Sequence, residues 1–151
     1  MFQGASQLNL DGKGRMAIPT KHRDPLIQVD GVVGDGRLLL TAHPEGCLLL
    51  YPLKAWEPIR DKLLTFPSLD RTASLWKRLL IGFADEVVLD SAGRILLSPE
   101  LRNFAAIEKQ VMLVGQGTHF EIWNLNAWND QLKALTSGTA GLPPGTENFS
   151  L

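Results

Sequence analysis

A long-range duplication constrains the fold of this chain more than any other feature of its sequence. Residues 11–15 and 90–94 share the pattern D-x-x-G-R, 79 residues apart. Each pattern is followed by an apolar segment and, eight residues after its arginine, by Arg23 or Arg102. A period this long indicates a duplicated small domain, because solenoid repeats are much shorter.

A second repeated segment follows each copy of this pattern. Residues 50–56 (LYPLKAW) match residues 122–128 (IWNLNAW) with an offset of 72. The first copy therefore holds seven more residues than the second, and the glycine-rich stretch 31–36 is the simplest place for them. One copy of about 50 residues buries too little surface to be stable alone. We therefore expect the two copies to share one core.

Composition indicates a globular cytoplasmic protein. Hydrophobic residues make up 44% of the 151, and no apolar run reaches the roughly 18 residues that cross a bilayer. The start of the chain lacks the basic and apolar blocks of a signal peptide. Cys47 is the single cysteine, which excludes an internal disulfide and fits a reducing compartment.

The distribution of charge is more informative than its total of −1. Residues 11–23 carry a net charge of +3, whereas the equivalent window 90–102 is neutral. The charged residues of the first window are Lys13, Arg15, Lys21, Arg23 and Asp11. We expect the first copy to face an anionic partner and the second copy mainly to support it.

Each copy is predicted to begin with a tight hairpin and a short helix. The hairpin strands are residues 7–10 and 15–18 in the first copy, and 86–89 and 94–97 in the second, with glycine where the turn needs positive φ. Ser98 and Pro99 are typical of a helix start, and Pro19 and Thr20 form a looser version of it. Two further strands close each copy, at 38–41 with 47–51 and at 111–114 with 120–123.

Helices are predicted after both copies. Residues 53–64 and about 68–83 form a helical linker, and the second helix has one apolar stripe. The stripe consists of Leu69, Ala73, Trp76, Leu79 or Leu80, and Phe83. The expected organisation is a first module at 5–52, the linker at 53–84, a second module at 85–125, a helix at 126–135 capped by Asn126, and a flexible tail at 136–151.

The sequence does not predict an enzyme, a metal site or a cofactor. Cys47 and His43 are conceivable as nucleophile and base, but Cys47 precedes an apolar run and is typical of a buried thiol. His22, His43 and His119 are not spaced like metal ligands, and no paired cysteines accompany them. Residues 12–14 (GKG) lack the Lys-Ser/Thr pair and the helix that follow a phosphate-binding loop.

The D-x-x-G-R turns admit a structural and a functional interpretation. Structurally, Asp11 and Asp90 pair with the arginines four residues later and accept hydrogen bonds from turn amides, while Gly14 and Gly93 permit the turn. Functionally, Lys13 and Arg15 project toward DNA, since arginine suits both phosphate and guanine. We expect function at Arg15 and structure at Arg94. The basic run 71–78 is expected to be a solvated helix face. The tryptophans are expected to be anchors in the core or in an interface.

Five motifs in order resemble the MraZ family of bacterial transcriptional regulators. They are MFQG at 1–4, DGKGR at 11–15, LLLYP at 48–52, DSAGR at 90–94 and FEIW at 120–123. The likeness extends from Met1 to about Leu135, and the five motifs together are highly specific. The resemblance implies a mainly β (α+β) fold in which two tandem SpoVT-AbrB-type modules form a pseudo-twofold double-split β-barrel with flanking helices.

The resemblance also implies a function. It implies a ring-shaped homo-oligomer, cytoplasmic and nucleoid-associated, that binds direct repeats of double-stranded DNA in the promoter of the division and cell-wall gene cluster containing its own gene. Neither a membrane nor a small-molecule substrate is expected. The DNA-binding candidates are Lys13, Arg15, Lys21, Arg23 and Arg94. The alternative is an AbrB-type antitoxin that binds a partner protein through its C-terminal tail, although such proteins usually carry one module and a longer tail.

Overall fold

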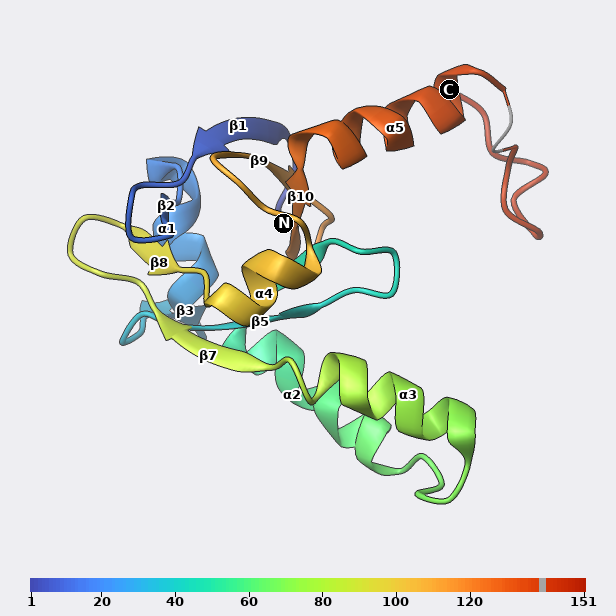
Figure 1. The fold of residues 1–151 in the computed structure, drawn as a ribbon, viewed down its shortest axis with the longest axis horizontal. Coiled ribbons are helices and arrows are strands. Elements are labelled where there is room, and N and C mark those ends of the chain that lie inside the picture. The colour runs from blue at the N-terminus through green and yellow to red at the C-terminus, as the bar shows by residue number, and fades with distance from the viewer. Residues whose placement is uncertain (139–140) are drawn as a thin grey trace.

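The computed structural model describes residues 1–138 and 141–151, which form an α+β fold with mainly antiparallel sheets (Figure 1). The described helices are α1 (Thr20–Ile27), α2 (Leu53–Leu64), α3 (Arg71–Leu80), α4 (Pro99–Phe104) and α5 (Leu125–Thr136). The strands are β1 (Ala5–Asn9), β2 (Arg15–Ala17), β3 (Gln28–Val29), β4 (Val32–Val33), β5 (Arg37–Ala42), β6 (Leu48–Pro52), β7 (Asp85–Val88), β8 (Arg94–Leu96), β9 (Gln110–Gly115) and β10 (Phe120–Asn124).

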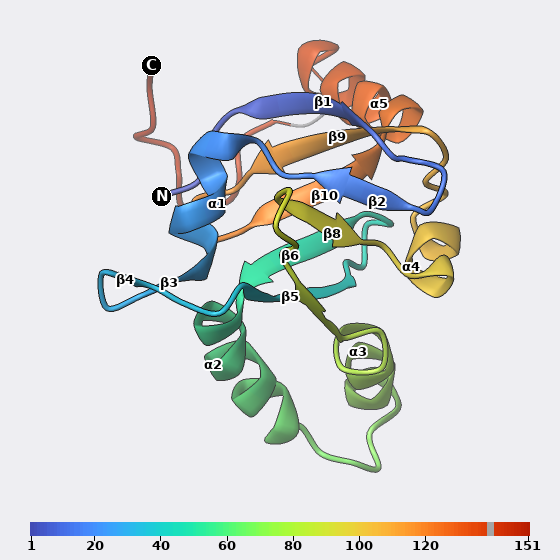
Figure 2. The ribbon, with the colours of Figure 1, turned by 90° about the vertical axis from the view of Figure 1, so that its left-hand side faces the viewer.

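The two halves of the chain exchange strands. The main sheet has six strands in the order β1-β9-β10-β6-β5-β7, so each outer strand pairs with a strand of the other half. β2 and β8 form a separate two-stranded ribbon, which we call the β2–β8 ribbon, and β3 pairs with β4. Figure 2 shows the ribbon lying across the main sheet. Among the described residues, the two edge strands of the main sheet do not pair with each other.

The predicted tight turn forms in each copy, but the predicted pairing of the two strands within a copy is wrong. Among the described residues, the first two strands are joined next to the turn by an isolated bridge between Leu10 and Met16 and by the hydrogen bond from the Asp11 amide to the Arg15 carbonyl. Met16 instead pairs with Ile95 at the centre of the β2–β8 ribbon, and both side chains are buried. Pairing across the halves places Met16 and Ile95 in the shared core, and burial of this apolar surface favours the exchange.

The strand register locates the seven extra residues of the first copy. Leu8 pairs with Val111, and the equivalent pair in the other half is Val87 with Leu38. The offset is 79 between Leu8 and Val87 but 73 between Leu38 and Val111, so six extra residues lie in the segment of β3 and β4 that precedes β5. The offset falls to 72 at β6 and β10, so the seventh lies in the loop after β5. The segment that holds these six residues includes the predicted stretch 31–36, whereas the seventh lies outside that stretch.

Both halves contribute to one main core, as predicted. Its fully buried side chains include Met16, Ile18, Leu38, Leu40, Leu48, Leu50, Ile95, Leu97, Leu113 and Phe120. A second cluster forms where α2 and α3 cover the other face of β5 and β6, around Leu39, Leu49 and Trp56. The buried hydroxyl of Thr41 donates a 2.6 Å hydrogen bond to the Leu80 carbonyl, which ties β5 to the end of α3.

Two helix boundaries differ from the prediction. α3 begins after Asp70, whose carboxylate accepts a hydrogen bond from the Ala73 amide at 2.7 Å, so the helix is shorter than 68–83 and Leu69 lies outside it, fully exposed. α5 begins at Leu125, one residue earlier than predicted. Its N-cap is Asn124, which ends β10 and accepts from the Ala127 amide at 3.1 Å. Asn126, the predicted cap, lies inside the helix.

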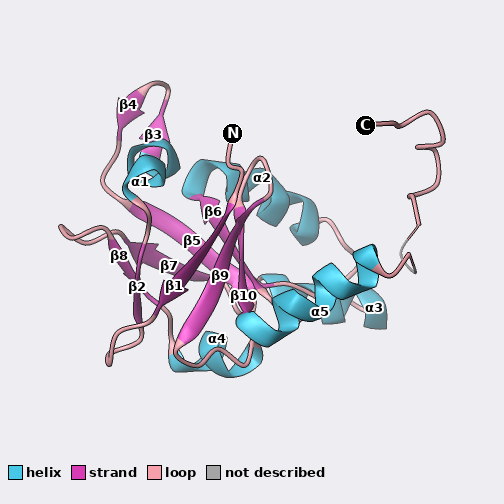
Figure 3. Cartoon of the chain, turned by 90° about the horizontal axis from the view of Figure 1, so that it is seen from above, coloured by secondary structure: helices cyan, strands magenta, loops and turns pink. Residues whose placement is uncertain are grey.

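The helices surround the sheet on several sides. The α2–α3 hairpin lies below the sheet and α5 leaves from above it, toward the C-terminal segment (Figures 1 and 3). The predicted tail, 136–151, begins within the end of α5 and includes residues 139 and 140, which lie outside the described residues. Residues 141–151 contain turns but no helix or strand. Within the described part of the chain, no helix is both long enough and apolar enough to span a bilayer.

Candidate nucleic-acid interface

Asp11 builds the first turn by accepting three hydrogen bonds. Its Oδ1 accepts from the amides of Lys13 and Arg15, both at 2.9 Å. Its Oδ2 accepts from Arg15 Nε at 2.7 Å. The Gly14 amide donates to the Asp11 carbonyl at 3.0 Å and closes the backbone. One carboxylate therefore fixes both the turn and the direction of the arginine side chain.

The second turn repeats this arrangement. Asp90 Oδ1 accepts from the amides of Ala92 at 2.9 Å and Arg94 at 2.8 Å. Asp90 Oδ2 accepts from Arg94 Nε at 2.9 Å. The predicted aspartate–arginine pairing is thus confirmed in both copies. Because the two turns are built alike, their geometry gives no reason to separate the role of Arg94 from that of Arg15.

These hydrogen bonds keep both aspartates ionised. Above all, the amide of Arg15 lowers the pKa of Asp11 from 3.8 to about 2, and the Arg15 side chain adds to the effect. The Arg94 amide lowers the pKa of Asp90 in the same way. Each arginine therefore has a permanent anionic partner at neutral pH.

Each turn is covered by an arginine from the other half of the chain. Arg23 donates from Nε to the Ile18 carbonyl at 2.8 Å, and its guanidinium lies over Gly93 of the second turn. Arg102 donates to the Leu97 carbonyl at 3.0 Å and lies over Gly14 of the first turn. Both glycines also have positive φ. A side chain is therefore disfavoured at each position by the backbone conformation as well as by contact with the arginine. The sequence signal for Arg102 is its spacing from Arg94, which repeats the spacing of Arg23 from Arg15.

Strand exchange separates the cationic window 11–23 in space. Lys13 and Arg15 lie in the first turn, next to α4, whose first turn carries Glu100. Lys21 and Arg23 belong to α1, which begins beside the second turn because the Ile18 amide donates to the Gly93 carbonyl. Figure 2 shows this crossed arrangement at the two ends of the β2–β8 ribbon. The cations we expected on the first copy are therefore shared between both turns.

The outer face of the β2–β8 ribbon presents the two arginines to solvent. Met16 and Ile95 point inward, so Arg15, Ala17, Arg94 and Leu96 lie on the outer side. The side chain of Arg15 is 29% exposed, and no described residue hydrogen-bonds its terminal nitrogens. Arg94 is 35% exposed, and its Nη1 lies 3.9 Å from Asp11 Oδ2. Lys13 and Lys21 are exposed beside the ribbon.

The residues considered for catalysis lie in surroundings that do not favour it. Cys47 is buried, and desolvation raises the pKa of its thiol far above the usual value, which disfavours the nucleophilic thiolate. His43 Nδ1 accepts from the Glu45 amide at 2.9 Å instead of contacting a nucleophile. Within the described ranges, no group of three or more histidine, cysteine, aspartate or glutamate side chains could hold a metal ion.

The fold and these turns define a class: duplicated α+β proteins whose halves exchange strands and present paired Asp–Arg turns. A family profile described as "MraZ protein, putative antitoxin-like" matches residues 1–79 and 80–140. The chain belongs to the MraZ family. It is 56% identical to the protein named transcriptional regulator MraZ of Methylobacillus flagellatus, over the full length of both chains. Full-length identity is 54% with the protein of that name from Aromatoleum aromaticum and 47% with that from Nitrosomonas europaea.

Proposed function

We propose that this chain is a transcriptional regulator that binds double-stranded DNA with the outer face of the β2–β8 ribbon. The names of its relatives support the regulatory role. One structural observation carries the choice of surface. Two arginines emerge from diagonal positions of the ribbon, each held by an aspartate through Nε, and the terminal nitrogens of Arg15 lack a partner among the described residues.

Aspartate pairing suits an arginine that has to read bases. Fixing Nε removes rotamer freedom before DNA binds, so less entropy is lost on forming the contact. The free edge of the guanidinium then matches the two acceptors of guanine in the major groove, or two phosphate oxygens. Arg15 and Arg94 are accordingly the proposed base-reading residues.

Attraction to phosphates has a different source. Each Asp–Arg pair is nearly neutral as a unit, so long-range attraction comes from the unpaired cations beside the ribbon. Lys13 lies at one end and Lys21 at the other. Arg23 lies at the rim of this surface, where its guanidinium also anchors the start of α1.

The wider proposal follows the family. The two halves are SpoVT-AbrB-type modules forming a pseudo-twofold double-split β-barrel, and several copies assemble into a ring. The ring binds direct repeats in the promoter of the division and cell-wall gene cluster that includes its own gene, in the cytoplasm at the nucleoid. Assembly supports this function physically, because several weak ribbons acting on one DNA gain by effective concentration.

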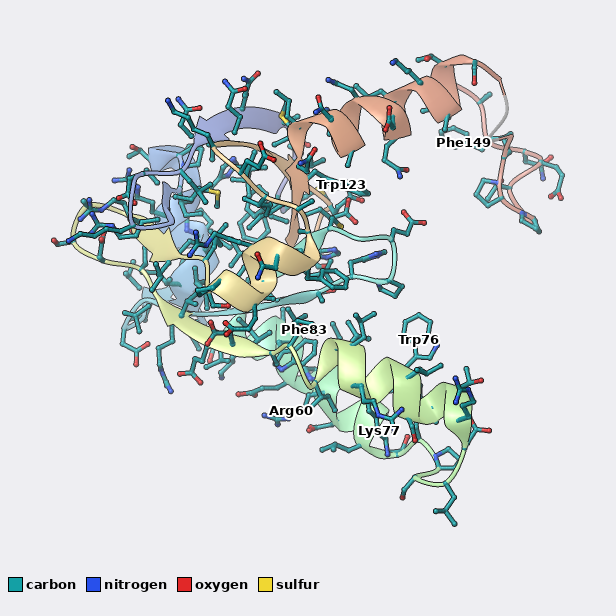
Figure 4. All side chains as sticks on the ribbon, in the orientation of Figure 1. Arg60, Trp76, Lys77, Phe83, Trp123 and Phe149 are labelled. Atoms are coloured by element: carbon teal, nitrogen blue, oxygen red, sulfur yellow. The ribbon has the colours of Figure 1, made fainter. Side chains whose placement is uncertain are left out.

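The deciding experiment is an electrophoretic mobility shift on the DNA upstream of the chain's own gene. Arg15→Ala is expected to weaken specific binding by about 10-fold to 100-fold, the range for losing one bidentate base contact. Arg60→Ala is the matched control, since Arg60 is also an exposed arginine paired with an aspartate, Asp61, but lies on α2 away from the ribbon (Figure 4). Unchanged binding by Arg15→Ala would remove the ribbon from the proposal.

A second candidate function is binding of a partner protein through the C-terminal segment. The family description includes the word antitoxin-like, and Leu142, Phe149 and Leu151 are exposed apolar side chains in this segment. Purification of the tagged chain from its own cells tests this candidate. A stoichiometric small partner that is lost when residues 141–151 are removed would favour it over the DNA-binding function.

A further inference from the structure

The outer face of the β2–β8 ribbon carries an exposed leucine that the proposed arginine contacts leave unexplained. Four side chains lie on this face in two opposed pairs, Arg15 with Leu96 and Ala17 with Arg94. Leu96 is 51% exposed, whereas the next residue, Leu97, is fully buried. A surface that contacts only phosphates gains nothing from an apolar side chain of this size, because phosphates are bound by charged and polar groups.

Leu96 stands next to Arg15 in the closest kind of strand pair. The Leu97 amide donates to the Gly14 carbonyl at 3.0 Å, so these two opposed residues form a hydrogen-bonded pair. Because the two kinds of pair alternate along an antiparallel ribbon, Arg15 and Leu96 form a non-hydrogen-bonded pair, with Cα atoms about 4.5 Å apart. Successive base pairs are about 3.4 Å apart. A base that Leu96 contacts therefore lies within about two base pairs of a base read by Arg15.

The leucine makes the two ends of the ribbon different. The duplication relates Arg15 to Arg94 and Ala17 to Leu96. The arginines are identical, but Ala17 offers a single methyl group where Leu96 offers a branched side chain. Arg94 Nη1 also lies 3.9 Å from Asp11 Oδ2, whereas no second carboxylate in the described part of the chain forms an ion pair with Arg15. The pair of Arg15 and Leu96 thus joins a free guanidinium edge to an apolar surface.

Thymine is the base whose major-groove edge suits an apolar side chain. The major groove admits a two-stranded ribbon, and there thymine presents its C5 methyl group while guanine presents the two acceptors that suit arginine. We propose that Leu96 packs on a thymine methyl group next to the guanine bound by Arg15, and that this contact fixes the direction of the ribbon on DNA. This inference rests on the proposed DNA-binding function and names a second base that the ribbon recognises.

A ribbon with a fixed direction suits a target made of direct repeats. A ribbon with two equal ends would bind in either direction and would match a palindromic site, since symmetric proteins read symmetric DNA. With Leu96 at one end and Ala17 at the other, only one direction places the larger apolar side chain against the methyl group. Copies that all lie in the same direction read the same sequence on the same strand.

The experiment removes the methyl group from the DNA and the side chain from the protein. Deoxyuridine pairs as thymine does but lacks the C5 methyl group. The DNA upstream of the chain's own gene is therefore prepared with thymine and with deoxyuridine in its repeats. Electrophoretic mobility shift compares both duplexes with the parent, with Leu96→Ala and with the matched control Leu64→Ala. Leu64 is a leucine of similar exposure, 60%, at the end of α2. Circular dichroism checks each fold.

The parent and Leu64→Ala should bind the deoxyuridine duplex at least about 4-fold more weakly than the thymine duplex, the effect of losing one buried methyl group. Leu96→Ala should bind the thymine duplex more weakly than the parent does, and should bind both duplexes equally. An effect of the methyl groups on DNA shape alone would persist in this variant. Equal affinity of the parent for both duplexes, or a thymine preference in Leu96→Ala as large as the parent's, would overturn the proposal.

A further variant tests the direction of the ribbon. Ala17→Leu combined with Leu96→Ala moves the leucine to the opposite end. For the parent, deoxyuridine placed at one thymine at a time should reveal a sensitive thymine in each repeat, within about two base pairs of a guanine whose replacement by 7-deazaguanine weakens the parent but not Arg15→Ala. The exchanged variant should be insensitive at that thymine, and retained sensitivity there would contradict the assignment.

Failure of the DNA-binding function itself gives a different result. Arg15→Ala is measured on both duplexes beside the other variants. Binding by Arg15→Ala that equals the parent's would show that the ribbon is not the DNA-binding surface, and the proposed function would fall with the inference. Weak binding by Arg15→Ala, together with a parent that does not distinguish thymine from deoxyuridine, would overturn only the role of Leu96.

Discussion

At the scale of single residues, three glycines of the D-x-x-G-R turns differ in how much an added methyl group would disturb the structure around them. Gly93 has a φ of 75°, and Arg23 occupies the space where a Cβ would lie. Gly14 has a φ of 82°, but its neighbour is the more loosely fitting end of Arg102. Gly12 has open space around it and no positive φ. The glycine at the fourth position of the D-x-x-G-R pattern therefore has a steric cause in both turns.

We expect the three alanine variants to rank by this crowding. Gly93→Ala should lower the free energy of unfolding by about 2–3 kcal/mol, combining the left-handed backbone with a displaced Arg23 and its lost hydrogen bond. Gly14→Ala should cost about 1–2 kcal/mol. Gly12→Ala is the control and should stay within about 0.5 kcal/mol of the parent. Urea unfolding measures all three, and equal effects at positions 12 and 93 would contradict the explanation.

The lowered pKa of Asp11 makes part of the stability depend on pH. Its folded-state pKa of about 2 lies below the usual 3.8, so its contribution is fully present above pH 3.8 and is lost as pH falls toward 2. The parent should therefore be more stable than Asp11→Asn at neutral pH, and the difference should shrink between pH 4 and pH 2. Urea unfolding of both proteins across this range tests the expectation, which a constant difference would refute.

At the scale of elements, the start of α5 is fixed by the strand that precedes it. Asn124 ends β10, caps α5 through Oδ1 and donates from Nδ2 to the Ala106 carbonyl. Asn126 has a sequence position that also fits a cap, yet it lies exposed in the first turn of the helix. The strand decides between them, because a cap needs the extended backbone found at the end of β10.

Alanine at these two asparagines should have opposite consequences. Asn124→Ala should destabilise the protein by about 1–2 kcal/mol, through loss of the cap and of the bond to Ala106. Asn126→Ala should be neutral or slightly stabilising, since alanine is the better helix former. Thermal unfolding of both variants checks this, and the reverse ranking would show that the cap is misassigned.

At the scale of the whole molecule, strand exchange makes the two halves one folding unit. β1 depends on β9 and β7 depends on β5, while β2 pairs with β8 and β6 with β10. Neither half contains the partners of its own outer strands. The shared core around Met16, Ile95 and Phe120 has the same consequence, because each half alone would expose it.

We therefore expect one cooperative transition for the intact chain, with equal calorimetric and van't Hoff enthalpies. A chain split in the loop 65–70 should reassemble when both fragments are mixed, whereas either fragment alone should lack a folded circular dichroism spectrum. The control is the same mixture with Met16→Asp in the first fragment, which places a charge at the centre of the β2–β8 ribbon. Independent folding of a single fragment would contradict the exchange.

The sequence by itself determined the local structure that short-range chemistry controls. The duplication was visible directly in the repeated motifs of the sequence. The Asp–Arg turns, the Ser98 cap and helix α2 were predictable because each depends on neighbours within a few residues. The sequence also identified Lys13, Arg15, Lys21, Arg23 and Arg94 as candidates, whose contact with DNA stays a prediction.

Only the tertiary structure decided which strands pair and which cations become neighbours. Residues 7–10 and 15–18 alternate as well for a hairpin as for exchange, and the choice depends on apolar surface that lies about 80 residues away along the chain. The same exchange places Lys21 beside the second turn and Arg102 over the first. Spacing along the chain cannot give these contacts, because burial of a shared core, and not local preference, brings the two halves together.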